Sequence, residues 1–134
     1  MLDIVSATTS TGEHDAMTDE QRIQKLQKGL SVVVHMSKPK SIYRDPVALY
    51  AAENGLLTYC GRQSHYTGHK RSPYANPFTS RHGTRDEICD LFEQETLPKL
   101  DITPLKGRAL GCWCYPERCH CDALAREANQ HQHH

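Results

Sequence analysis

The stretch Ser31-Val32-Val33-Val34-His35 decides the fold of this 134-residue sequence. Three consecutive β-branched residues predict a short strand, and their unbroken apolar run predicts that both faces of this strand are covered. Strands of this kind are typical of parallel sheets that carry helices on both faces. The neighbouring sequence should therefore contain helices that alternate with further strands.

Helix signals occur on both sides of this strand. Thr18 and Gln21 form a capping-box pattern, and Asp45, which precedes a proline, is a typical helix start. Thr84 begins a second capping box, and Asp122 is positioned to cap a last helix. The sequence thus predicts four helices, at residues 18–29, 45–55, 84–92 and 122–128.

Two more apolar segments, residues 56–60 and 109–113, predict strands. Strands joined through helices are usually parallel, with right-handed crossovers. We therefore expect an α/β fold: a small single domain over residues 18–129, with a mainly parallel sheet flanked by helices. Residues 1–17 are expected to form a disordered leader and residues 130–134 a frayed, His-rich tail.

The composition excludes some classes of function. The sequence has 16 Lys and Arg residues and 16 Asp and Glu residues, so its net charge of +0 indicates no class of partner. No run approaches the roughly 20 apolar residues of a membrane span, and the start lacks a secretory signal, so we expect a cytoplasmic protein with no membrane partner. There, the six cysteines are expected to be reduced thiols, metal ligands or catalytic groups rather than disulfides.

Polar segments follow each predicted strand. His35 and residues 37–40 follow the first strand, Gly61 and Arg62 the second, and residues 114–120 the third. Parallel strands end at the same edge of a sheet, and ligands of such folds bind beyond that edge. The three loops are therefore expected to converge on one site.

The loop after the second strand carries a local charge that the neutral total conceals. No Asp or Glu occurs from Asn54 to Arg85, whereas Arg62, other cationic residues and several tyrosines do. This mixture suits a phosphate beside a planar base, because guanidinium groups bind phosphate oxygens and aromatic rings stack. A solvated loop with ordinary surface charge is the alternative. Within the loop, Asn76-Pro77-Phe78 is either a rigid turn or a turn whose Asn76 amide faces the ligand.

The densest cluster of chemically active side chains is Cys112-Trp113-Cys114-Tyr115-Pro116-Glu117-Arg118-Cys119-His120-Cys121-Asp122. Cys112 and Cys114 share one face of a strand, and a turn at Pro116 returns the later cysteines at a helix start. Four thiols and an imidazole suit zinc or an iron–sulfur cluster. The two C-x-C arms differ from the usual C-x-x-C knuckles, so two other interpretations stay open.

The first of these is thiol chemistry. The partial positive charge of a helix N-terminus and nearby Arg118 would lower the pKa of Cys119 or Cys114, with His120 as the proton partner of this nucleophile. The second is purely structural, with Cys112 and Cys114 as small buried side chains and His120 on backbone carbonyls.

The order and spacing of these blocks resemble the bacterial and phage family known as domain of unknown function four-three-two-six. The resemblance covers about residues 31–129 and implies a small cytosolic α/β domain with a shared polar site and no established reaction. It rests on Tyr59-Cys60-Gly61-Arg62, Asn76-Pro77-Phe78, Arg85, and Leu110-Gly111-Cys112-Trp113-Cys114 with Pro116 and Cys119-His120-Cys121-Asp122.

The family motif implies a set of site residues. Positions that match it are Gly61, Arg62, Asn76, Pro77, Cys112, Cys114, Cys119, His120 and Asp122. This sequence departs from the family at Cys121, where the family pattern more often has glycine. By this resemblance the expected metal ligands are Cys112, Cys114, Cys119 and His120.

Our leading hypothesis is a domain that binds a nucleotide or another phosphorylated ligand at the carboxyl edge of the sheet. Arg62 and Arg85 would hold the anion and Asn76 would read a polar group, with Gly61 and Asp122 as further binding residues. Cleavage or transfer of the ligand would use Cys119 or Cys114 as nucleophile and His120 as acid or base, or a metal in their place. The alternative hypothesis is a metal-stabilised module that binds nucleic acid along its phosphate backbone.

Overall fold

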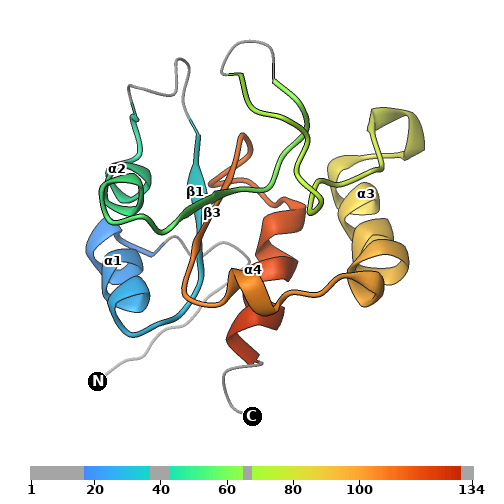
Figure 1. Cartoon of the computed structure of the whole chain (residues 1–134). Coiled ribbons are helices and arrows are strands. Elements are labelled where there is room, and N and C mark those ends of the chain that lie inside the picture. Colours follow the sequence, from blue (N-terminus) through green and yellow to red (C-terminus); the bar gives the residue numbers. More distant parts are fainter. Residues whose placement is uncertain (1–16, 37–42, 65–67, 131–134) are drawn as a thin grey trace, which may run out of the picture.

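A computed structural model of the chain describes residues 17–36, 43–64 and 68–130. A three-stranded parallel sheet lies between two layers of helices (Figure 1). Its strands are β1 (Val32–His35), β2 (Leu57–Tyr59) and β3 (Ala109–Cys112), in the order β1-β3-β2. The predicted α/β fold with a parallel sheet is confirmed. The predicted leader, apart from its last residue, and residues 131–134 of the predicted tail lie outside the described residues.

The four predicted helices form, and their starts follow local capping chemistry. They are α1 (Asp19–Gln27), α2 (Pro46–Glu53), α3 (Arg85–Leu91) and α4 (His120–Gln130). Thr18 and Thr84 form the predicted capping boxes, and the Asp45 carboxylate accepts a hydrogen bond from the Val47 N–H. In the described part of the chain, no helix has the length and apolar character needed to cross a membrane.

The start of α4 differs from the prediction. The helix begins at His120, so Asp122 lies inside its first turn and is not the residue that precedes it. The Cys119 sulfur accepts the Cys121 N–H at 3.3 Å, and Asp122 Oδ2 accepts the Cys119 N–H at 2.9 Å. Sequence rules missed this start because they look for an oxygen-bearing side chain before the helix, whereas here a thiol lies at that position.

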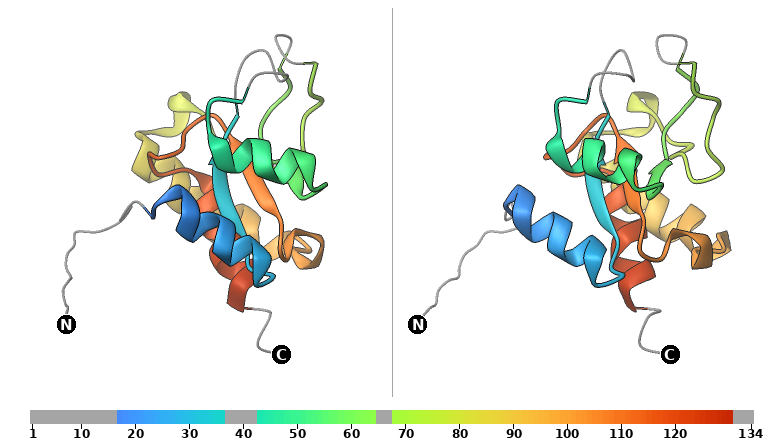
Figure 2. Two further views of the ribbon diagram at one scale, coloured as in Figure 1. Left: turned by 90° about the vertical axis from the view of Figure 1, so that its left-hand side faces the viewer. Right: turned by 60° about the vertical axis from the view of Figure 1, so that its left-hand side comes forward.

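The helices cover both faces of the sheet. Figure 2 shows α1 and α2 on one side of β1 and β3, with α4 and the segment after α3 on the other. Val32 and Val34 of β1 pack toward α1 and α2, while Val33 packs toward α4. The unbroken valine run is therefore explained by burial on both faces, although β1 is an edge strand.

Helix α3 continues through a π-helical turn, η3 (Phe92–Thr96), and a short 3-10 turn, η4 (Leu97–Lys99). Cys89 and Phe92 are buried, with Phe92 in the core beside α4, whereas Ile88 is only partly buried and lines the cavity described below. Two further 3-10 turns are η2 (Ser80–His82) and η5 (Thr103–Leu105).

The first layer of helices is joined to the sheet by a buried ion pair. Arg22 of α1 is 3% exposed and donates two hydrogen bonds to the Asp45 carboxylate, at 2.8 and 2.9 Å. Arg22 also donates to the Val33 carbonyl at 3.1 Å, and Asp45 accepts the His35 N–H at 3.0 Å. Burial alone would raise the pKa of Asp45, but the hydrogen bonds and charge of Arg22 outweigh it and hold this pKa below its usual value.

Removing one partner of this pair should strongly destabilise the protein. We expect Asp45→Ala to lower the free energy of unfolding by about 3–5 kcal/mol, because it leaves the Arg22 charge buried without its main partner. Chemical denaturation measures this value. Asp19→Ala removes the exposed partner of the same arginine and should cost at most about 1 kcal/mol, so equal losses in the two variants would contradict the assignment.

The same pair should contribute to stability in a pH-dependent manner. Because the pKa of Asp45 is lower in the folded chain than the value of about 3.9 in an unfolded one, its contribution is complete above that value and is lost as the pH falls through the folded pKa. We expect the stability difference between the parent protein and Asp45→Asn to shrink as the pH falls from about 6 to 2. A stability difference that grows toward acid pH would show that the pKa of Asp45 is not lowered by folding.

Candidate functional site

A cavity of about 540 Å³ opens at the carboxyl edge of the sheet. Loops that follow β2 and β3 form its walls together with the start of α3. Arg62 and Asn76 line the same cavity as Cys114 and His120, so the expected convergence of the second and third loops is observed. Residues 37–42, in the loop after β1, lie outside the described residues. The lining residues are Tyr59, Gly61, Arg62, Gln63, Ser64, Asn76, Arg85, Ile88, Cys89, Cys112, Trp113, Cys114, Arg118, Cys119 and His120.

Two aromatic side chains from neighbouring strand ends meet in the cavity. Trp113 Nε1 donates a hydrogen bond to the Tyr59 hydroxyl at 3.0 Å, and that hydroxyl donates to the Arg62 carbonyl. The Tyr59 ring also stacks on His69, with ring centroids 4.3 Å apart. Gly61 is required by this packing, because a Cβ atom there would lie 2.6 Å from the Tyr59 hydroxyl oxygen.

The three arginines of the cavity differ in their surroundings. Arg62 donates to the Phe78 carbonyl at 3.1 Å, and no carboxylate of the described residues forms an ion pair with it. Arg85 forms an exposed ion pair with Glu117 at 3.0 Å and also contacts the Cys114 side chain.

Arg118 is held by ion pairs within the protein. Its guanidinium group bonds to three acidic side chains of α3 and η3, which raise its pKa. These acidic residues are Asp90, Asp86 and Glu93. These three ion pairs account for the position of the Arg118 side chain, and its predicted effect on Cys114 or Cys119 stays a prediction.

Asn76 holds the loop that follows β2 through two hydrogen bonds of its side-chain amide. Its Oδ1 accepts the Phe78 N–H at 2.9 Å, and its Nδ2 donates to the Ile88 carbonyl of α3 at 3.2 Å. Asn76 is 7% exposed, so these bonds replace the water that burial removes. These contacts hold the loop against α3, and the predicted contact of Asn76 with a polar ligand group stays a prediction.

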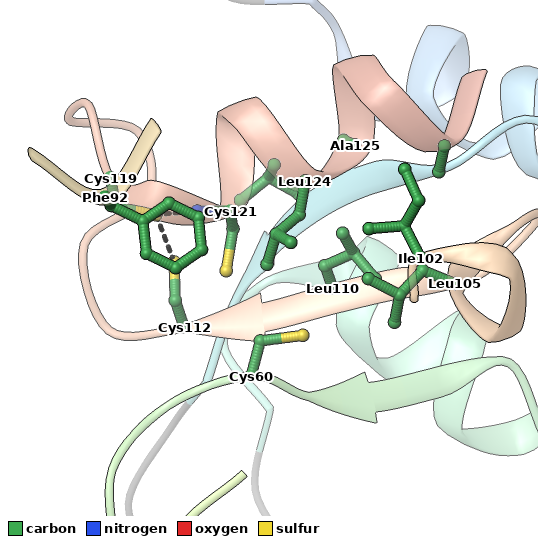
Figure 3. Close-up of a cluster of buried hydrophobic side chains, with 12 residues drawn as sticks. Cys60, Phe92, Ile102, Leu105, Leu110, Cys112, Cys119, Cys121, Leu124 and Ala125 are labelled. Carbon is green, nitrogen blue, oxygen red and sulfur yellow. Dashed lines mark hydrogen bonds between the residues drawn. The ribbon is translucent and has the colours of Figure 1, made fainter. Parts of the chain in front are cut away.

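Cysteine sulfurs gather at the inner side of the cavity, where the end of β3 meets the start of α4 (Figure 3). Cys112, Cys119 and Cys121 are buried, and their Sγ atoms all lie within 4.8 Å of one another. The closest pair, Cys112 and Cys119, is 3.0 Å apart. Cys114 is partly exposed and its side chain contacts both of these residues. Three close cysteines could thus hold a metal ion, and Cys121 is one of them.

These contacts shift the pKa values of the thiols in opposite directions. Hydrogen bonds from Cys114, Cys119 and Cys121 hold the pKa of Cys112 well below its usual range. The same hydrogen bonds to Cys112, with burial, raise the pKa values of Cys119 and Cys121. Cys119 is also buried, so its sulfur is less accessible than that of Cys114, and its role as a nucleophile stays a prediction.

The imidazole of His120 bonds to a backbone carbonyl and also lies near one cysteine sulfur. Its Nε2 lies 2.8 Å from the Cys60 carbonyl oxygen and 3.9 Å from Cys121 Sγ, and its ring packs against Phe92. Burial lowers the pKa of this imidazole, so the neutral form is favoured and Nε2 carries the proton that bonds to the carbonyl. This geometry matches the structural interpretation of His120 and does not place the imidazole as proton partner of Cys119.

Asp122 does not line the cavity. Its carboxylate bonds to the Cys119 backbone at the start of α4, so its position gives no support to the predicted ligand-binding role. Tyr59, one of the tyrosines expected near the ligand, lines the cavity, whereas sequence reasoning missed Trp113 and Cys89 as lining residues. The alternation of strand residues could have suggested Trp113, but no local signal marks Cys89, which reaches the cavity from α3.

The exposure of the thiols predicts an order of modification. We expect iodoacetamide to alkylate Cys114 in the folded protein before Cys112, Cys119 or Cys121, because only Cys114 of these four is partly exposed. Peptide mass spectrometry of protein quenched at intervals measures the order. Alkylation in denaturant, where all six cysteines should react, is the control, and a faster reaction at Cys119 would contradict this geometry.

Comparisons with known proteins give a family without an established activity. The sequence profile of the family described as Domain of unknown function (DUF4326) matches residues 51–130, which include every lining residue of the cavity. Over 70 residues the chain is 29% identical to an uncharacterized 12.4 kDa protein in the nrdA-td intergenic region of Enterobacteria phage T4. The match covers 46% of this chain and 65% of the phage protein, just under two thirds of that relative. No solved structure matches the chain.

Proposed function

The chain belongs to the DUF4326 family, and we propose that this member binds a nucleotide or a related phosphorylated ligand in the cavity at the carboxyl edge of its sheet. One observation carries the proposal. The cavity combines arginine side chains with an aromatic pair, and none of its described lining residues is an aspartate or a glutamate. A ligand that has both a phosphate and a planar ring matches both halves of this lining.

The phosphate end is assigned to Arg62 and Arg85. Both guanidinium groups are exposed enough to meet a ligand, and Arg62 has no competing carboxylate among the described residues. Arg85 would exchange its exposed pairing with Glu117 for a phosphate, an exchange that costs little because exposed ion pairs contribute at most about 1 kcal/mol. Planar guanidinium groups can bind two phosphate oxygens at once.

The base end is assigned to Tyr59 and Trp113. Their shared hydrogen bond and their packing with His69 and His35 hold the two rings at the ends of neighbouring strands. Stacking of a base on an aromatic ring contributes about 1–3 kcal/mol. The cavity volume of about 540 Å³ lies within the usual range for small-molecule sites and leaves room for a base, a sugar and a phosphate.

The cysteine cluster supports a second component of this function. We infer that it holds a metal through thiolates, either zinc or an iron–sulfur cluster, because these are the metals that cysteine sulfur favours. The metal would join the end of β3 to the start of α4 and so support the back wall of the cavity.

Ligand binding can be followed through Trp113, the only tryptophan of the chain. We expect nucleoside monophosphates to change its fluorescence in a saturable manner, and nucleosides or inorganic phosphate alone to bind more weakly. Arg62→Ala should weaken binding of the monophosphate by about tenfold or more, because a charge-assisted hydrogen bond contributes about 1.5–3 kcal/mol. Calorimetric titration provides an independent measurement.

Arg71→Ala is the matched control, because Arg71 is an exposed arginine of the same loop that does not line the cavity. Equal losses in the two variants, or no saturable binding of any nucleotide, would overturn the assignment. Binding of single-stranded nucleic acid instead, with affinity that falls steeply as salt rises, would favour the metal-stabilised nucleic-acid module over the nucleotide pocket.

A further inference from the structure

The positions of the cysteine side chains indicate a different set of metal ligands from the one that the family motif implies. We infer that Cys112, Cys114, Cys119 and Cys121 form a closed site for one zinc ion, with Cys121 rather than His120 as the fourth ligand. This inference deepens the metal component of the proposed function and does not depend on nucleotide binding.

Sulfur positions favour a single ion. A zinc ion with four thiolates has bonds of about 2.3 Å, so tetrahedral geometry sets its sulfur atoms about 3.8 Å apart. The Sγ atoms of Cys112, Cys119 and Cys121 lie within 4.8 Å of one another, and their closest pair is 3.0 Å apart, so small side-chain rotations would reach this spacing. An iron–sulfur cluster places several irons and sulfides between its cysteines and requires a wider opening than these buried residues leave.

The backbone brings the four ligands together as two arms. Cys112 ends β3 and Cys114 follows it on the same side, while Cys119 and Cys121 lie at the start of α4. The Glu117 N–H donates to the Cys114 carbonyl at 2.8 Å and closes the turn between the arms. Cys114 is not one of the three sulfurs that lie within 4.8 Å of one another. Its side chain contacts Cys112 and Cys119 from the side that faces the cavity, so a rotation of this partly exposed side chain would supply the fourth sulfur.

The surroundings supply positive charge for a site of four thiolates. Arg85 contacts the Cys114 side chain, and the Cys121 N–H donates to Cys119 Sγ at 3.3 Å. Both thiols of the second arm also lie at the N-terminal end of α4, where the partial charge of the helix is positive. Hydrogen bonds to ligand sulfurs and charges around them are the outer contacts that orient and stabilise thiolate ligands.

His120 is engaged elsewhere. Its Nε2 bonds to the Cys60 carbonyl, and the ring also contacts the backbone of Tyr74. An imidazole that turned toward the sulfurs would leave the buried Cys60 carbonyl without this donor, at a cost of about one hydrogen bond. Cys121 needs no such rearrangement, because its Sγ is already within the group.

The test measures metal on the full chain, produced with zinc in the medium and without an affinity tag. His131, His133 and His134 are replaced by alanine so that the tail adds no metal of its own. We expect one zinc ion per chain by mass spectrometry, and a cobalt-substituted protein with the absorption spectrum of a tetrahedral tetrathiolate. Cys121→Ser should lose most of the zinc, while His120→Asn should keep it.

Cys89→Ser is the matched control, since Cys89 is a buried cysteine that lies outside the four ligands, and it should keep a full zinc ion. If Cys121→Ser fails to fold, the cobalt spectrum of the parent chain decides alone, because a histidine ligand lowers the intensity of its sulfur-to-metal charge-transfer bands. Loss of zinc in His120→Asn with retention in Cys121→Ser would overturn the inference.

Other outcomes separate this inference from the proposed function. Iron with acid-labile sulfide in place of zinc would overturn the single-ion site and leave the proposed metal cluster in place. A folded chain that takes up no metal would overturn both the zinc site and the metal component of the proposed function. Nucleotide binding is measured independently through Trp113, so its failure would leave the zinc result unaffected.

Discussion

The central position of β3 is the constraint on which the candidate site depends. Met36 donates its N–H to the Cys112 carbonyl at 2.8 Å on one side, and Cys60 donates to the Gly111 carbonyl at 3.0 Å on the other. Parallel pairing on both sides makes the three strands end together, so the loop with Arg62 meets the loop with the cysteines. Gly111 lies at this crowded centre, because Met36 occupies the space that a Cβ atom would need.

The loop between β3 and α4 is held from both layers of helices. Arg22, already bound to Asp45, places its guanidinium carbon 4.4 Å from the centroid of the Tyr115 ring. Arg118 of the same loop bonds to the acidic side chains of α3 and η3. Two arginines thus fix the segment that carries Cys114 and Cys119, and the ion pairs that stabilise the fold also determine the shape of the cavity wall.

Prediction from the sequence succeeded where one short segment carries the whole signal. The capping boxes at Thr18 and Thr84 and the valine run of β1 depend on neighbours in the chain, and the structure confirms them. The sequence could not show in this way whether His120 or Cys121 lies with the other cysteines as a candidate metal ligand. Successive helix residues point about 100° apart, so a spacing shows that both lie at the helix start but not which one faces β3.

By itself, the sequence determined that the chain is an α/β domain with a parallel sheet, and that basic and sulfur-rich loops follow its strands. Hydrophobic periodicity, capping residues and turns depend on residues that are close together in the chain, so they can be recognised from the sequence alone. Only the tertiary structure decided that Arg118 and Asn76 are used internally, and that Cys121 joins Cys112 and Cys119. Such roles follow from burial and from partners distant in the chain, because a polar or charged side chain removed from water must bond to whatever the fold brings near it.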